Sequence, residues 1–119
     1  MTRPNKYRAR KTSVDGITFD SQAEAFRYGS LKLLEKAGDI SGLKLQPEYA
    51  FMEGGKKAFR YTADFQYLRG NRVIIEDVKG VDTDASRLRR KLTELRHGVE
   101  VRVVDRYGNP KKPSRRKRK

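Results

Sequence analysis

The sequence contains no cysteine, only one histidine and no long apolar run. Without cysteine there are no disulfides, no thiolate nucleophiles and no cysteine-ligated zinc, so any metal must be held by oxygen ligands. No apolar stretch approaches the ~20 residues that a membrane span needs, and the basic start of the chain lacks the apolar segment of a secretory signal. We therefore expect a soluble, cytoplasmic protein with no membrane partner.

At 119 residues the chain has room for one domain, and its net charge of +14 is unevenly distributed. Residues 1–12 hold five Lys and Arg, residues 110–119 hold seven, and neither segment holds an acid. The residues between them carry a net charge of only +2. The pattern predicts one domain over residues 13–106, between a basic N-terminal arm, 1–12, and a basic C-terminal tail, 107–119, that is expected to be disordered.

The basic flanks fit two interpretations. Blocks of like charge are usually solvated tails, but Lys and Arg also neutralise phosphates and release counterions, which gives affinity without sequence selectivity. The second interpretation is favoured, with DNA as the partner, although the charge pattern does not distinguish DNA from RNA. The tail residues expected to contact nucleic acid are Lys111, Lys112, Arg115, Arg116, Lys117 and Arg118.

The first half of the chain shows hairpin and helix signals. Alternating residues 14–19 surround an Asp-Gly pair, which indicates a short hairpin. Ser21 begins a capping box, and apolar residues then recur at helical spacing until Gly38. Residues 43–52 contain Pro47, which cannot donate to a central ladder, and they predict an irregular or edge strand.

The second half predicts two strands, a helix and a final strand. Residues 59–68 and 72–79 are rich in aromatic and β-branched residues and are separated by Gly70-Asn71. The following helix, capped within residues 82–84 and ending at Gly98, should bury a stripe of apolar side chains. The last strand covers 99–103 and can follow a right-handed crossover, which makes the sheet mixed and the fold class α/β. The residues of the helical stripe are Ala85, Leu88, Leu92 and Leu95.

The two long strands predict a pair of opposed carboxylates. If Gly70-Asn71 closes a hairpin, partner numbers sum to 141 and Asp64 faces Asp77. Like charges at that spacing repel, and Mg²⁺ bound by one or two carboxylates would offset the repulsion. Lys79 lies ~7 Å farther along the same face. The alternative is a salt-bridged surface without chemistry. The predicted faces are Asp64, Gln66, Ile75, Asp77 and Lys79, and opposite them Tyr61, Ala63, Phe65, Tyr67, Ile74 and Val78.

Other charged residues have two interpretations each. Glu24 is the third helical residue of the capping box and can either bond the Ser21 amide or serve the carboxylate site. Glu76 points to the face opposite Asp77 and is not counted as a ligand. The charges of the second helix can be a solvated face or phosphate contacts. The candidate phosphate contacts on this helix are Arg87, Arg90 and Lys91.

Four motifs together resemble a known nuclease superfamily. They are Phe19-Asp-Ser-x-x-Glu24, Gln46-Pro47, Tyr61-Thr-Ala-Asp-Phe65 and Glu76-Asp-Val-Lys-Gly80. They are similar to the PD-(D/E)xK nucleases and, more closely, to a phage and prophage family known as domain of unknown function 1064. The resemblance implies a restriction-endonuclease-like αβββαβ core with a mixed central sheet flanked by helices. Ala63 stands where the superfamily motif has proline, a position without a functional group.

The resemblance also implies roles for the site residues. Asp64, Asp77 and the Val78 carbonyl would hold Mg²⁺ or Mn²⁺, Lys79 would act on the attacking water, and Glu24 would bind a second metal or orient water. Gln46 would contact nucleic acid. The implied activity is metal-dependent DNA cleavage in phage DNA processing, with branched DNA such as Holliday junctions as a candidate substrate and a homodimer by analogy. The competing hypothesis is a non-catalytic nucleic-acid-binding protein on the same scaffold.

Overall fold

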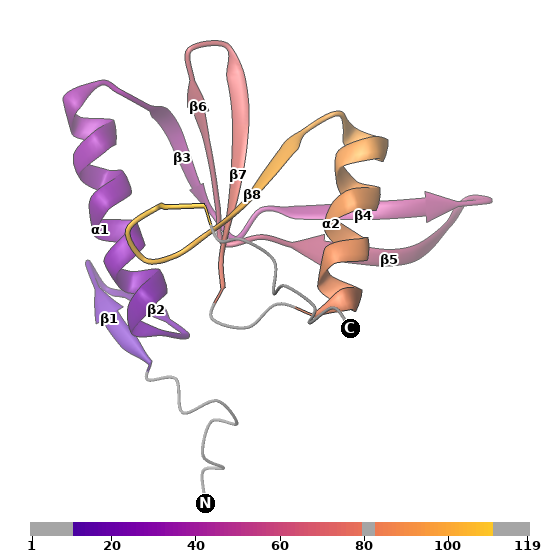
Figure 1. Cartoon of the computed structure of the whole chain (residues 1–119), viewed down its shortest axis with the longest axis horizontal. Helices are drawn as coiled ribbons and strands as arrows, with labels where there is room; N and C mark the ends of the chain where they lie inside the picture. Colours follow the sequence, from indigo (N-terminus) through magenta and orange to yellow (C-terminus); the bar gives the residue numbers. More distant parts are fainter. Residues whose placement is uncertain (1–10, 80–82, 111–119) are drawn as a thin grey trace, which may run out of the picture.

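The computed structural model describes residues 11–79 and 83–110. Two helices and eight strands follow one another along these residues (Figure 1). No helix within the described ranges is long and apolar enough to cross a membrane. In chain order, the elements are β1 (Thr12–Val14), β2 (Ile17–Phe19), α1 (Gln22–Ala37), β3 (Ser41–Leu45), β4 (Glu48–Glu53), β5 (Lys56–Thr62), β6 (Phe65–Arg69), β7 (Arg72–Val78), α2 (Asp84–His97) and β8 (Glu100–Val104).

The central sheet has four strands in the order β3-β6-β7-β8. β3, β6 and β7 pair antiparallel, and β8 pairs parallel to β7 after the crossover through α2. Figure 1 shows α1 and α2 on opposite sides of this sheet. The predicted mixed sheet and α/β class are thereby confirmed.

The β6–β7 hairpin has the register expected from its turn. Phe65 pairs with Glu76 and Arg69 with Arg72, so partner numbers sum to 141. Gly70 adopts a φ of 61°, a left-handed value that glycine reaches without a side-chain clash. The short turn therefore determines which side chain of β7 faces which side chain of β6.

Helix α1 begins and ends at the predicted residues. The Ser21 hydroxyl accepts the Glu24 amide at 3.1 Å, and Gly38 ends the helix with a φ of 86°. One face of α1 packs on one face of the sheet and forms the larger apolar core. The fully or largely buried members of this core are Phe19, Ala25, Tyr28, Leu31, Ile40, Phe65, Tyr67 and Ile74.

The structure corrects the two longest predicted strands. Residues 59–68 divide into β5 and β6, and residues 43–52 divide into β3 and β4. The breaks face each other, because the Gln46 amide donates to the Asp64 carbonyl at 2.9 Å and the Ala63 amide donates to the Pro47 carbonyl at 3.0 Å. β4 and β5 thus leave the central sheet together as a separate two-stranded hairpin.

The break also changes which face two side chains occupy. Tyr61 and Ala63, predicted to share the core face of Phe65, instead form a second buried cluster with Ile75. A side-chain period of two holds only along a continuous strand, and the chain changes direction at Ala63-Asp64. The prediction for Tyr61 and Ala63 was therefore wrong.

Helix α2 does not bury the apolar face that the sequence predicted. Leu88 and Leu95 are 59% and 72% exposed, whereas Arg90 and Thr93 are 7% and 2% exposed. The Thr93 hydroxyl donates to the Arg89 carbonyl at 2.8 Å, which satisfies it inside the helix. The helix packs on β4 and β5 through polar and aromatic side chains, and the predicted burial of Leu88 and Leu95 was wrong.

Contacts extend beyond the predicted domain boundaries at both ends. Thr12 begins β1 and pairs with Phe19. At the other end, the Asp105 amide donates to the Asn109 carbonyl at 3.0 Å, and Arg27 donates to the Tyr107 carbonyl at 3.4 Å. The rest of the predicted arm and tail lies outside the described residues.

A buried ion pair joins α1 to β7. Arg27 donates through Nε to Glu76 Oε1 at 2.8 Å and through Nη2 to Oε2 at 2.7 Å. The Tyr67 hydroxyl also donates to Glu76. Glu76 is only 1% exposed. These hydrogen bonds to Glu76 raise the pKa of Arg27 despite its burial. The bidentate geometry holds the helix at a defined position over the strand.

We expect Arg27→Met to destabilise the fold by about 3–5 kcal/mol, because it leaves the Glu76 carboxylate buried without a cation. Chemical denaturation of both proteins measures this difference. Lys32→Met removes an exposed cation from the same helix and should change stability by less than about 1 kcal/mol. Equal effects of the two substitutions would contradict the inference that the ion pair of Arg27 with Glu76 stabilises the packing of α1 on β7.

Candidate active site

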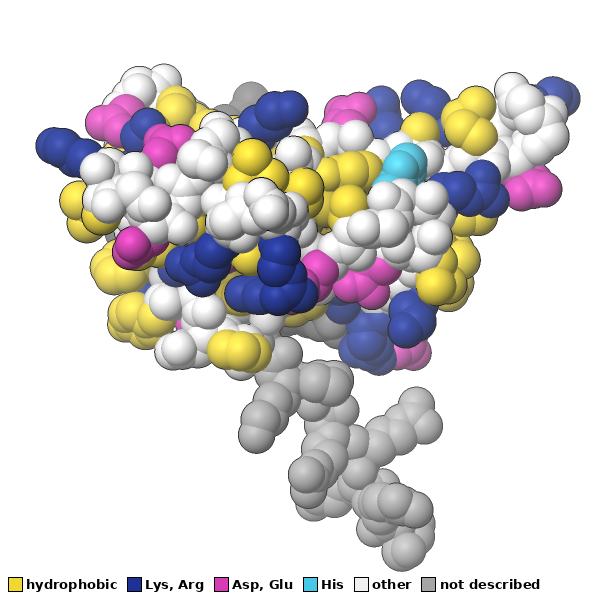
Figure 2. All heavy atoms as spheres, turned by 90° about the horizontal axis from the view of Figure 1, so that it is seen from above, with side chains coloured by type: hydrophobic (Ala, Val, Ile, Leu, Met, Phe, Trp, Pro, Cys, Tyr) yellow, Lys and Arg dark blue, Asp and Glu magenta, His cyan; other side chains and the backbone are white. Residues whose placement is uncertain are grey.

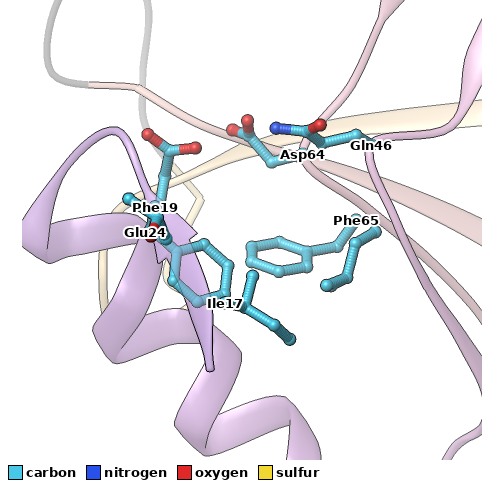
Figure 3. A pocket seen from close by; sticks show the side chains of 8 residues that line it. Ile17, Phe19, Glu24, Gln46, Asp64 and Phe65 are labelled. Atoms are coloured by element: carbon cyan, nitrogen blue, oxygen red, sulfur yellow. The ribbon is translucent and has the colours of Figure 1, made fainter. Parts of the chain in front are cut away.

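Three carboxylates approach one another where α1, β6 and β7 meet. Asp64 directly precedes β6, Asp77 lies near the end of β7, and Glu24 belongs to the first turn of α1. Figure 3 shows the carboxylates of Glu24 and Asp64 at one rim of a pocket, with the Gln46 amide beside Asp64. The structure therefore places Asp64 near both Glu24 and Asp77, which belong to two other predicted motifs.

The pocket at this rim has a volume of about 90 Å³. Ile17, Phe19 and Phe65 form its apolar wall, and Glu24 and Asp64 contribute its charged groups (Figure 3). The pocket thus places two acidic side chains beside an apolar wall.

Asp64 is held in place by the neighbouring strand. The Val78 amide donates to Asp64 Oδ2 at 2.7 Å. Burial, followed by the negative charges of Glu24 and Asp77, raises the pKa of Asp64 to about 8. A hydrogen bond with the Glu24 side chain acts in the same direction. Without a cation, a proton on Asp64 relieves the repulsion among these acids.

Asp77 is buried, with 2% of the residue exposed. Burial raises its pKa, while a hydrogen bond from the Tyr61 hydroxyl and the charges of Lys79 and Arg90 act in the opposite direction. Sequence reasoning missed Tyr61, because its place in an aromatic strand carries no signal of a polar role. The Lys79 amide donates to the Val104 carbonyl at 3.1 Å, so β8 fixes the backbone of that residue.

Glu24 makes a capping contact and also lies near Asp64. Ser21 donates its hydroxyl to Glu24 Oε1 at 3.0 Å, a capping contact made through the Ser21 side chain instead of its amide. The same carboxylate also faces Asp64 at the pocket rim (Figure 3). Helix capping therefore fixes the side chain that approaches the acidic pair.

The donor set fits a divalent cation with few protein ligands. Within residues 11–79 and 83–110, no three His, Asp or Glu side chains are arranged around one metal position. Mg²⁺ often uses only one or two carboxylates and completes its shell with water and phosphate oxygens. Asp64 and Asp77 supply such a pair. Burial raises the pKa of both carboxyls, and the charges of Glu24 and Asp77 add a repulsion at Asp64 that a cation would relieve. Glu76 is engaged by Arg27 instead.

The predicted nucleic-acid contacts fall in different surroundings. Gln46 is exposed at the pocket rim with a φ of 52°. Arg87 pairs with Asp84, and Lys91 is exposed. Arg90 is buried near Asp77 instead of lying on a solvated face. Lys111, Lys112, Arg115, Arg116, Lys117 and Arg118 lie outside the described residues.

The fold and site together define a mixed α/β domain in which the half-buried Asp64 and the buried Asp77 lie near Lys79. The chain belongs to a family described as a protein of unknown function, DUF1064, whose model matches residues 4–109. No curated protein and no solved structure matches the chain. The match includes all four motifs and extends into the basic N-terminal segment.

We expect Asp64→Asn to change how stability depends on pH. Because the pKa of Asp64 is raised to about 8 from 3.8, the folded protein binds a proton that the unfolded chain has lost, and stability falls as pH rises between these values. In EDTA, thermal unfolding from pH 5 to 8.5 should therefore show the parent losing stability relative to Asp64→Asn. Parallel curves would show that Asp64 titrates normally.

Proposed function

We propose that the protein is a metal-dependent endonuclease that hydrolyses DNA phosphodiester bonds. The observation that carries the proposal is the proximity of Asp64 to both Asp77 and Glu24, with Lys79 close to Asp77. Two carboxylates with raised pKa values beside a lysine support this proposal, because strongly perturbed titratable groups cluster at functional sites. The resemblance of the four motifs to PD-(D/E)xK nucleases supports the same chemistry.

Each residue has a role in the proposed reaction. Asp64, Asp77 and the Val78 carbonyl would hold Mg²⁺ or Mn²⁺, which supplies Lewis-acid stabilisation of the phosphate charge. Lys79 would hold the attacking water or stabilise negative charge that develops on the phosphate oxygens. Glu24 would accept a proton from that water or orient it. Tyr61 would position Asp77 through its hydrogen bond.

The proposal also covers the DNA substrate and the oligomeric state of the protein. Branched DNA, such as a Holliday junction, is the proposed substrate, and two copies would be needed to cut both strands of it. The role would belong to phage or prophage DNA processing in the cytoplasm of a bacterial host. Both points rest on the resemblance to phage enzymes.

Asp77→Ala should lower cleavage by about 10²–10³-fold, because it removes a buried group that would hold the metal next to the reacting phosphate. The measurement uses labelled junction, flap, duplex and single-stranded DNA with Mg²⁺ or Mn²⁺. Asp39→Asn, an exposed acid at the other end of α1, should cut like the parent. Cleavage that survives both Asp77→Ala and EDTA would refute the proposal.

Lys79→Met should reduce kcat by about 10²-fold, because the interaction is made mainly with charge that develops in the transition state. Binding of Mn²⁺, followed by calorimetry, should persist in this variant. The matched control is Lys44→Met, which removes an exposed lysine from β3. A rise in KM with kcat unchanged would instead assign Lys79 to substrate binding.

The second candidate function is nucleic-acid binding without cleavage. It is favoured by one observation, which is that no three acidic or histidine side chains in the described part are arranged around a metal. It predicts salt-sensitive DNA binding and no products with any divalent cation. A metal-dependent nick that Asp77→Ala abolishes would exclude it.

A further inference from the structure

The β4–β5 hairpin forms a unit with α2 that extends beyond the central sheet. The two strands make a sheet of their own, and Figure 1 shows them reaching past α2 on the side away from α1. Tyr61 in β5 touches the candidate site through Asp77, and Lys56 begins the same strand. At ~3.3 Å per residue, these two positions are roughly 17 Å apart. The hairpin unit, defined as residues 48–62 and 84–97, therefore connects the site to a distant tip.

Aromatic side chains join the hairpin to α2. Phe51 and Phe59 are cross-strand partners with stacked rings at 4.9 Å. The Arg96 guanidinium lies 4.4 Å from the Phe51 ring centre, and that of Arg89 lies 5.7 Å from the Phe59 ring centre. The His97 ring lies 5.2 Å from that of Tyr49. These cation–π contacts hold two arginines along the length of the hairpin before any ligand binds.

The hairpin unit contains the net positive charge of the described chain. It holds eight Lys and Arg against four acids, for a net charge of +4. The other described residues, 11–47, 63–79, 83 and 98–110, hold ten of each and are neutral. Figure 2 shows Lys and Arg side chains near His97, the cyan side chain, toward the end formed by the hairpin. The cations of the unit are Lys56, Lys57, Arg60, Arg87, Arg89, Arg90, Lys91 and Arg96.

We propose that the hairpin unit binds the phosphate backbone of duplex DNA beside the cleavage site. The position of that site comes from the proposed function, whereas the binding surface itself comes from the charge distribution. A span of roughly 17 Å exceeds the ~12 Å width of the major groove, so a phosphate at the site and one at Lys56 can lie on opposite sides of a groove. Lys and Arg contacts to phosphate position DNA without reading its sequence.

The placement of the aromatic rings favours duplex over single-stranded DNA. Proteins that grip single strands stack bases on exposed aromatic side chains. Here Phe51, Phe59 and Tyr49 are partly buried, and their rings contact Arg96, Arg89 and His97 of α2. The exposed groups at the tip include the cations Lys56 and Lys57, with Glu53 as the cross-strand partner of Lys56. The unit thus offers charge for a backbone and no free ring for a base.

The test compares two triple variants that lose equal charge. One is Lys56→Gln/Lys57→Gln/Arg60→Gln on the hairpin, and the other is Lys32→Gln/Lys36→Gln/Lys44→Gln on α1 and β3. All six side chains are exposed, so both variants should fold, which thermal unfolding checks. Both full-length proteins and their parent carry Asp77→Ala, and binding to a duplex of about 25 base pairs is measured in EDTA by fluorescence anisotropy.

The expected result is a change in salt dependence for the hairpin variant alone. The slope of log K against log salt should fall in magnitude by about 2–3, since each lost phosphate contact removes ~0.9, with a loss of affinity of at least ~10-fold at low salt. An unchanged slope, or an equal change in the control variant, would overturn the proposal. A greater loss for single strands than for duplex would overturn the choice of duplex.

This binding result is separable from the proposed nuclease activity. The assay contains no divalent metal and uses a background that should not cut, so it does not depend on catalysis. Cleavage by the parent together with an unchanged salt slope would reject the interface and keep the nuclease. A shifted slope without cleavage in any metal would keep the interface and reject the nuclease.

Discussion

The ion pair between Arg27 and Glu76 determines how α1 sits on the central sheet. Arg27 lies one helical turn after Glu24, and Glu76 directly precedes Asp77. Two hydrogen bonds of 2.7–2.8 Å between the pair therefore limit the distance between the helix that carries Glu24 and the strand that carries Asp77. A single carboxylate–guanidinium contact aligns two elements far apart in sequence, and the candidate site forms where they meet.

Side chains alternate between the two faces of β7, so the neighbouring residues Glu76 and Asp77 have different partners. Glu76 points toward α1 and is neutralised by Arg27, while Asp77 points to the opposite face and contacts Tyr61. Adjacent residues on a strand face opposite sides of a sheet. Both neighbouring acids can therefore be buried, because each has its own hydrogen-bond partners on its own face of the sheet.

Much of the fold could be predicted from local patterns. The helix caps at Ser21 and Gly38 and the turn at Gly70-Asn71 each depend on residues close in sequence, and these predictions were confirmed. The division of residues 59–68 depends instead on backbone hydrogen bonds with Gln46 and Pro47. Such pairing between distant segments leaves no periodic signal in either one.

The part of the candidate site that depends on strand register could be predicted from the sequence. The part that depends on tertiary packing could not. The hairpin turn was enough to bring Asp64 toward Asp77. Tyr61 reaches Asp77 only because the strand breaks after it, and Arg90 is buried because α2 turns a polar face inward. The apolar stripe did not predict the buried face of α2, because Arg89 and Arg96 of this helix contact the aromatic rings of the hairpin instead of leucines.

The pairing of Arg27 with Glu76 also constrains how the family can diverge. Losing either partner leaves a buried charge, whereas exchanging both for apolar residues of similar volume can be nearly neutral. Substitutions at positions 27 and 76 should consequently appear together among relatives. A relative that has lost both charges would have replaced an electrostatic link between helix and strand by packing alone.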